Sequence, residues 1–120
     1  MNREYSFIVP VYNRPEETRE LLQSMAALKF DRGFEVVIVE DGSSRTSEEV
    51  IKEFKDHLDI SYYFKDNSGP GKSRNFGMHR AKGNYFLILD SDVILPEDYL
   101  QQVDKGLNEN YCDCFGGPDG

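Results

Sequence analysis

Positive charge is scarce in this sequence. Its 120 residues include 14 lysines and arginines against 22 aspartates and glutamates, which gives a formal net charge of −8. Proteins that bind nucleic acids or anionic membrane surfaces usually present a basic surface, so the acidic balance disfavours both kinds of partner. A local group of positive side chains is therefore more informative here than it would be in a neutral chain.

Cysteines are also few, and no long hydrophobic run occurs. Cys112 and Cys114 are one residue apart, a spacing that puts side chains on opposite faces of a strand and disfavours a disulfide between them. Two thiols do not complete a four-ligand zinc site, so reduced structural cysteines are the favoured interpretation. No apolar run approaches the ~20 residues of a membrane span. Residues 1–5 lead straight into a predicted strand without a signal peptide, which predicts a cytoplasmic protein.

Short apolar runs alternate with helical patterns along the chain. The predicted strands span residues 5–11, 34–39, 60–64 and 84–89. The second and fourth runs are nearly continuous in Val, Ile, Leu and Phe, which is typical of parallel strands covered on both faces. The predicted helices span residues 15–29, 47–58, 72–82 and a segment from Pro96 to Leu107.

This alternation predicts an α/β fold, a mostly parallel sheet with right-handed crossovers and helices on both faces. Residues 1–120 are expected to form a single domain. Thr46 and Glu49 fit a capping box at the start of the second helix. "YCDCF" at 111–115 predicts the start of a further strand, and no covering helix follows it. The chain is therefore expected to be the N-terminal piece of a longer protein, whose exposed edges could drive artificial dimers.

Polar residues follow every predicted strand. In open α/β sheets, ligands bind outside the carboxyl ends of the strands, so these residues are the candidate site. They are Tyr12 and Asn13 after the first strand, Glu40 and Asp41 after the second, Asp66 and Asn67 after the third, and Asp90, Ser91 and Asp92 after the fourth. Their convergence predicts a ligand site along one edge of the sheet.

Asp90, Ser91 and Asp92 form the only D-x-D in the chain. Two carboxylates at this spacing after a buried strand can hold Mg²⁺ or Mn²⁺, which completes its shell with water and phosphate oxygens. A calcium loop of the EF-hand type would need Asp or Asn at Ile94. The structural alternative is that Asp92 caps the turn and Asp90 is solvated.

The remaining candidates have structural alternatives as well. Asp41 precedes a glycine, as turn residues often do, but its carboxylate could accept a hydrogen bond from a ribose hydroxyl or a base N–H. Tyr12 could stack on a base or simply pack. Lys72 and Arg74 either form a solvated helix start or lie there because an anion binds, since positive charge at a helix N-terminus is otherwise slightly unfavourable.

The segment "NSGPGKSRN" (67–75) makes a P-loop nucleotide hydrolase the first alternative function. Gly71-Lys72-Ser73 matches the end of a P-loop, and "YFLILD", ending in Asp90, resembles a Walker B strand. Against this, Asp66 stands where the loop needs its first glycine, and the loop follows the third strand instead of the first. A non-catalytic nucleotide-binding module on the same fold is the other alternative.

Three stretches, taken together and in this order, resemble the family 2 glycosyltransferases of the GT-A fold. They are "SFIVPVYNRPEETRELLQSM", "FEVVIVEDGSS" and "SGPGKSRNFGMHRAKGNYFLILDSDVILP". The resemblance runs from about Tyr5 to about Leu100 and covers the N-terminal half of such enzymes. It implies a Rossmann-like domain that binds a nucleotide-sugar, with the acceptor half missing.

The resemblance also implies roles for the candidate residues. The residues expected to line the base, usually uracil, are Pro10, Val11, Tyr12 and Asn13. Asp41 would contact the base or the ribose, and Glu40 is secondary because the family more often has Asp-Asp there. The residues in the segment that holds ribose and diphosphate are Lys72, Arg74 and Asn75. Asp92 would ligate Mn²⁺ or Mg²⁺ directly, and Asp90, beside Ser91, would bind the ribose or reach the metal through water.

The activity implied is metal-assisted, inverting transfer of a sugar from a nucleotide-sugar, usually a UDP-sugar, to an acceptor hydroxyl. A divalent ion would act as a Lewis acid on the leaving diphosphate, and a carboxylate would deprotonate the acceptor. That base is expected beyond Gly120, so the fragment alone is expected to be inactive. A glycan or lipid-linked acceptor, polysaccharide biosynthesis and membrane association of the full-length protein on the cytoplasmic side are family-level expectations.

Overall fold

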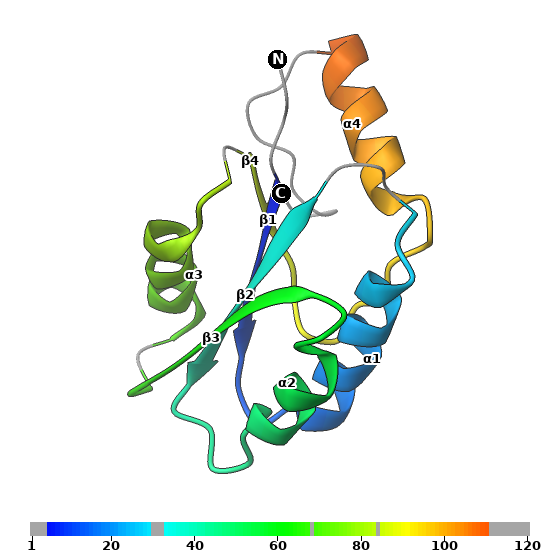
Figure 1. Ribbon diagram of the computed structural model, residues 1–120. Coiled ribbons are helices and arrows are strands. Elements are labelled where there is room, and N and C mark those ends of the chain that lie inside the picture. The colour runs from blue at the N-terminus through cyan, green and yellow to red at the C-terminus, as the bar shows by residue number, and fades with distance from the viewer. Residues whose placement is uncertain (1–4, 30–32, 68, 84, 111–120) are drawn as a thin grey trace.

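The computed structural model describes residues 5–29, 33–67, 69–83 and 85–110 (Figure 1). Its strands are β1 (Tyr5–Val11), β2 (Phe34–Asp41), β3 (Asp59–Lys65) and β4 (Tyr85–Ile88). Its helices are α1 (Pro15–Ala26), α2 (Glu48–Phe54), α3 (Pro70–Arg80) and α4 (Tyr99–Asn110). The predicted alternation of strands and helices is confirmed. The strand predicted at 111–115 and both cysteines lie outside the described residues.

The strands form one parallel sheet in the order β3-β2-β1-β4. Val11 at the end of β1 pairs with Glu40 on β2, and Asp41 at the end of β2 pairs with Lys65 on β3. The carboxyl ends of these three strands are therefore level. This register is what brings the loops after the strands to a common edge.

Helices cover both faces of the sheet, as predicted. On one face, the apolar side chains of α1, α2 and α4 pack against alternate residues of β1 and β2, such as Phe7 and Ile38. On the other face, α3 packs against Ile8, Val37 and Val39 (Figure 1). Both faces are buried because the strands are apolar at odd and even positions alike. None of the helices in the described ranges is long and apolar enough to cross a membrane.

Two helices are shorter than the sequence predicts. The helix predicted over 15–29 ends at Ala26, and the Lys29 N–H instead donates a hydrogen bond to the Glu97 carbonyl, 2.8 Å away. The helix predicted over 47–58 ends at Phe54, whose carbonyl accepts the N–H groups of both His57 and Leu58. The apolar stripe continues past each end because these residues still face the core.

Gly77 on α3 sits directly on the sheet. A Cβ built there would lie 2.6 Å from Cγ2 of Ile8 and 3.3 Å from Cγ2 of Val39. Only a residue without a side chain lets α3 approach the strands this closely. The distance between helix and sheet fixes, in turn, where the start of α3 meets the edge of the sheet.

We predict that Gly77→Ala destabilises the fold by about 1–3 kcal/mol, because the added methyl overpacks the contact with Ile8. Urea unfolding followed by circular dichroism measures this change. Gly71→Ala is the matched control on the same helix, since nothing lies within 4 Å of its added methyl, and it should be neutral or slightly stabilising. Equal stability of the Gly77 variant and the wild type would show that α3 does not depend on this contact.

Candidate nucleotide site

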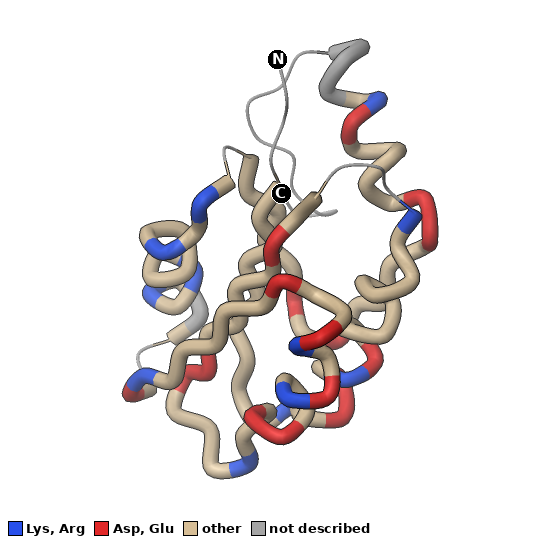
Figure 2. The backbone as a smooth tube through the Cα atoms, viewed as in Figure 1, with Lys and Arg blue, Asp and Glu red and all other residues tan. Residues whose placement is uncertain are grey.

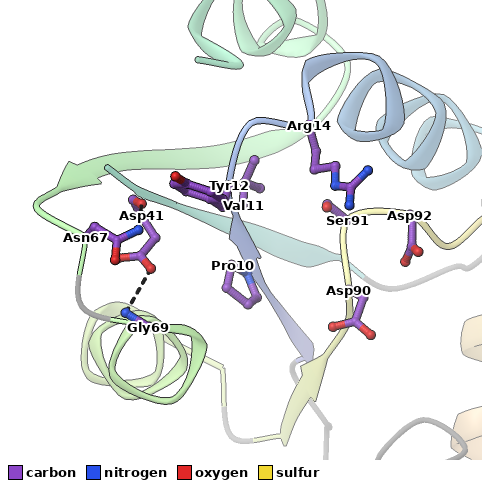
Figure 3. A pocket seen from close by; sticks show the side chains of 10 residues that line it. All are labelled: Pro10, Val11, Tyr12, Arg14, Asp41, Asn67, Gly69, Asp90, Ser91 and Asp92. Atoms are coloured by element: carbon purple, nitrogen blue, oxygen red, sulfur yellow. Dashed lines mark hydrogen bonds between the residues drawn. The ribbon is translucent and has the colours of Figure 1, made fainter. Parts of the chain in front are cut away.

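A cavity of about 410 Å³ opens at the carboxyl edge of the sheet (Figure 3). Small-molecule sites typically occupy ~300–1,000 Å³. Its lining comes from the end of β1, the end of β2, the loop between β3 and α3, and the loop after β4. The lining residues are Pro10, Val11, Tyr12, Arg14, Asp41, Asn67, Gly69, Asp90, Ser91 and Asp92.

Most of the site residues predicted from the sequence lie in this cavity. Those in the lining are Pro10, Val11, Tyr12, Asp41, Asn67, Asp90, Ser91 and Asp92. Those outside it are Asn13, Glu40, Asp66, Lys72, Arg74 and Asn75. Tyr12 is 52% exposed, so much of its surface remains open to the cavity and to solvent.

Asn13 organises the loop after β2 and does not line the cavity. Its φ of 53° lies in the left-handed region, which Asn tolerates better than most residues. Its N–H donates to Ser43 Oγ (2.8 Å), and its Oδ1 accepts the N–H groups of Ser44 and Arg45, each at 2.9 Å. Asn13 therefore joins the end of β1, next to Tyr12, to the loop that follows β2.

Glu40 is fully buried on the face of the sheet opposite to Asp41. Its carboxylate accepts hydrogen bonds from the Ser43 hydroxyl, the Ser47 N–H (2.7 Å) and the Tyr62 hydroxyl (2.9 Å). Burial, reinforced by the hydrogen bond to Glu40, raises the pKa of Tyr62 well above its usual range. Glu40 thus stabilises the protein interior and does not line the cavity.

The capping box predicted at Thr46 is wrong. The N-cap of α2 is Ser47, and no side chain caps the helix. The Ser47 N–H donates to the buried Glu40 carboxylate instead. This hydrogen bond to a residue of β2 takes the place of the capping box predicted between Thr46 and Glu49.

Asp41 fixes one end of the cavity. Its Oδ1 receives a hydrogen bond from Lys65 Nζ at 2.9 Å, and its Oδ2 receives one from the Gly69 N–H at 3.0 Å. Its carbonyl accepts from Asn67 Nδ2 at 3.1 Å. Gly42 makes this contact possible, because a Cβ there would lie 2.7 Å from the Asn67 nitrogen. One residue of β2 therefore holds both the end of β3 and the start of α3.

Asp90 and Asp92 present two exposed carboxylates beside a buried Ser91. The pairing with β1 continues up to this motif, since the Leu89 N–H donates to the Ile8 carbonyl at 3.0 Å. Neither carboxylate forms an ion pair with any residue that the structure describes. Within the same ranges, no group of three or more His, Cys, Asp or Glu is arranged to hold a metal. The pair fits Mn²⁺ or Mg²⁺ only as a site shared with ligand oxygens and water.

Lys72, Arg74 and Asn75 are exposed on the first turns of α3, outside the cavity lining. The positive charge of this helix is spread along its length and is not gathered at its N-terminus (Figure 2). The Gly69 N–H at that terminus is already bonded to Asp41.

Two lining residues were not predicted as site residues: Arg14 and Gly69. Arg14 lies three residues after the end of β1, so the rule that ligands bind beyond strand ends points to it as well. In the sequence it reads as the residue before a helix that begins at Pro15. Gly69 lies in the loop after β3, beside Asn67, which the strand-end rule did predict.

A parallel α/β sheet with a cavity and a carboxylate pair at its carboxyl edge defines a Rossmann-like ligand-binding domain. The sequence model described as Glycosyl transferase family 2 matches residues 6–118, and the chain belongs to this family. Its fold is the GT-A fold of such enzymes.

Three relatives illustrate the match. Glycosyltransferase GlyA of Streptococcus pneumoniae is 37% identical over 112 residues, which cover 92% of this chain and 16% of GlyA. The crystal structure of Staphylococcus aureus TarS 1-349 in complex with UDP-GlcNAc superposes with a TM-score of 0.82 at 33% identity, covering 90% of this chain and 32% of that one. The mannosyltransferase PcManGT of Pyrobaculum calidifontis, solved with GDP-Man and Mn²⁺, gives a TM-score of 0.82 at 23% identity, over 89% and 33% of the two chains. The chain thus spans a third or less of each relative.

We predict that Glu40→Ala lowers the free energy of unfolding by at least ~2 kcal/mol, because it leaves buried donors of Ser43, Ser47 and Tyr62 without their acceptor. Urea unfolding gives the value. Glu49→Ala, at an exposed position on α2, is the control and should change the stability by less than about 0.5 kcal/mol. Similar losses in the two variants would contradict the structural role of Glu40.

We predict that Lys65→Met costs about 3 kcal/mol of stability, because it removes the ammonium that faces the buried Asp41 carboxylate. Lys52→Met, which removes a lysine from exposed pairs with Glu48 and Glu49, should cost less than about 1 kcal/mol. Thermal and urea unfolding of both variants test the difference. If Lys65→Met lowers the stability no more than Lys52→Met does, the ion pair between Lys65 and Asp41 does not hold the loop.

Proposed function

We propose that this chain is the donor-binding part of an inverting glycosyltransferase. The enzyme would transfer a sugar from a nucleotide-sugar, specifically a UDP-sugar, to an acceptor hydroxyl with the help of Mn²⁺ or Mg²⁺. The observation that carries the proposal is a single cavity with an open aromatic ring and a fixed carboxylate at one end and the D-x-D carboxylates at the other (Figure 3). Family membership and the likeness to a TarS structure that holds UDP-GlcNAc support it.

The end of the cavity with Tyr12 and Asp41 suits a nucleobase. The exposed Tyr12 ring offers a surface for stacking. Asp41 is held in place by Lys65 and Gly69, and as a carboxylate it can only accept hydrogen bonds. Uracil offers an imide N–H to such an acceptor, whereas the corresponding ring nitrogen of cytosine is itself an acceptor. The site should therefore prefer UDP to CDP.

The other end suits the diphosphate with its metal. Asp92 would bind the ion directly, and Asp90 would bind through water or contact the ribose. The bound ion would supply Lewis-acid stabilisation of the leaving diphosphate. The chain's own contribution is to hold the two carboxylates at the end of β4, where they share a cavity with the base-binding residues.

The residues named above would bind the donor and its metal ion, and none of them is assigned to the acceptor. An inverting reaction needs a base on the sugar face opposite the diphosphate, to take the proton of the acceptor hydroxyl. We assign that base and the acceptor pocket to the part of the relatives that this chain does not span. The chain alone should bind the donor without transferring its sugar. A glycan or lipid-linked acceptor, polysaccharide biosynthesis and a cytoplasmic location remain predictions.

The P-loop alternative fits less well. Lys72 follows β3 and Asp90 follows β4, and these strands are the opposite edges of the sheet, with β2 and β1 between them. The Ser73 side chain, whose hydroxyl would bind Mg²⁺ in a P-loop, is buried. The exposed Lys72 also lies outside the cavity lining.

We predict that UDP binds in a Mn²⁺-dependent manner and that Asp92→Ala abolishes this dependence, because it removes the direct ligand of the ion. Isothermal titration calorimetry with UDP, with and without Mn²⁺, measures the effect, and CDP tests the base preference. Asp56→Asn, at an exposed acid in the turn after α2 and outside the cavity lining, is the control. ATP binding that depends on Lys72 without a preference for UDP would favour the P-loop alternative. Absence of any nucleotide binding would leave only a non-catalytic role.

A further inference from the structure

The charges around the cavity are unequal. Three of its ten lining residues are aspartates, and Arg14 is the one lysine or arginine among the described residues that line it. A divalent ion would balance the charges of Asp90 and Asp92 and leave the diphosphate uncompensated. We propose that Arg14 binds the diphosphate of the nucleotide-sugar. This inference rests on the proposed function.

The position of Arg14 fits this role. It lies between the end of β1 and the start of α1, as the N-cap residue of that helix. Its side chain extends toward Ser91, with Asp92 close by, whereas Asp41, Asn67 and Gly69 lie at the opposite end of the cavity (Figure 3). A nucleotide whose base lies near Tyr12 and Asp41 would therefore direct its phosphates toward Arg14.

Arg14 is also available to a ligand. Its side chain is 61% exposed, and its ion pair with Glu17, at 3.2 Å, is exposed as well. Such surface pairs contribute little, so a phosphate could replace Glu17 at small cost. Of the other candidate cations, Lys65 is bonded to Asp41, and Lys72 and Arg74 are not among the lining residues.

The guanidinium group suits a diphosphate better than an ammonium would. Its planar fork donates two parallel hydrogen bonds to phosphate oxygens, and its charge is permanent. These properties distinguish it from a simple surface ion pair at the start of a helix, which any cation could form with Glu17. The distinction can be measured by comparing a ligand with phosphates and a ligand without them.

We predict that Arg14→Gln weakens binding of UDP in the presence of Mn²⁺ by about 10- to 100-fold, because it removes charge-assisted hydrogen bonds to the diphosphate. Binding of uridine, which lacks phosphates, should not change. Arg14→Lys should give an intermediate loss, since it keeps the charge but not the fork. Calorimetric titrations of the chain with UDP and with uridine, at one ionic strength, provide both affinities.

Two further variants sharpen the test. Arg19→Gln removes an arginine of α1 from its exposed pair with Glu53 of α2 and should leave both affinities unchanged. Glu17→Gln frees Arg14 from its present partner and should raise UDP affinity, by up to about fivefold.

The outcomes separate this inference from the proposal on which it rests. If the wild type binds UDP and Arg14→Gln binds it equally well, the inference is wrong and the proposed function stands. Equal losses of UDP and uridine affinity would show that Arg14 only shapes the cavity, which also overturns the inference. If the wild type binds no UDP, the proposed function fails and the inference fails with it.

Discussion

The carboxylate of Asp41 is the contact on which the candidate site depends. It is buried at the end of β2, and it holds Lys65 of β3 and the Gly69 N–H at the start of α3. Both groups belong to the segment that joins β3 to α3, and they lie 24 and 28 residues beyond Asp41 along the chain. Without this carboxylate the loop after β3 would lose its anchor, and with it one end of the cavity. The fold delivers the strand ends to one edge, but Asp41 turns that edge into a defined site.

Glu40 and Asp41 show how two neighbouring acids take different tasks. Successive residues of a strand point to opposite faces, so only one of the two can face the cavity. The additional methylene of Glu40 lets its carboxylate reach the Ser47 N–H and the Tyr62 hydroxyl on the other face. The loop after β2 is thus held from inside by Glu40 and from the side by Asn13. Both support the cavity without lining it.

The sequence predicted the fold well because its main signals are local. Continuous apolar runs mark strands buried on both faces, and the alternation with helices determines a parallel sheet. Helix ends were less predictable, since the Lys29 N–H and the Ser47 N–H find partners outside their own helices, at Glu97 and Glu40. The rule that ligands bind beyond the carboxyl ends of parallel strands predicted most of the residues that line the cavity, including Tyr12 and Asp92. It could not predict which side of α3 would carry Lys72, because that depends on how Gly69 and Gly77 seat the helix against the sheet.

On the proposed function, an acidic chain has to bind an anionic donor despite the repulsion between like charges. The cavity carries three aspartates, and only Asp41 has a cation of the protein bonded to it within the described residues. A diphosphate would be repelled by the other two until a divalent ion lies between them. On the proposed function, metal and donor should therefore bind together, each raising the affinity for the other by the same factor. The same excess of negative charge that disfavours nucleic-acid binding would then make the binding of the donor depend on the metal.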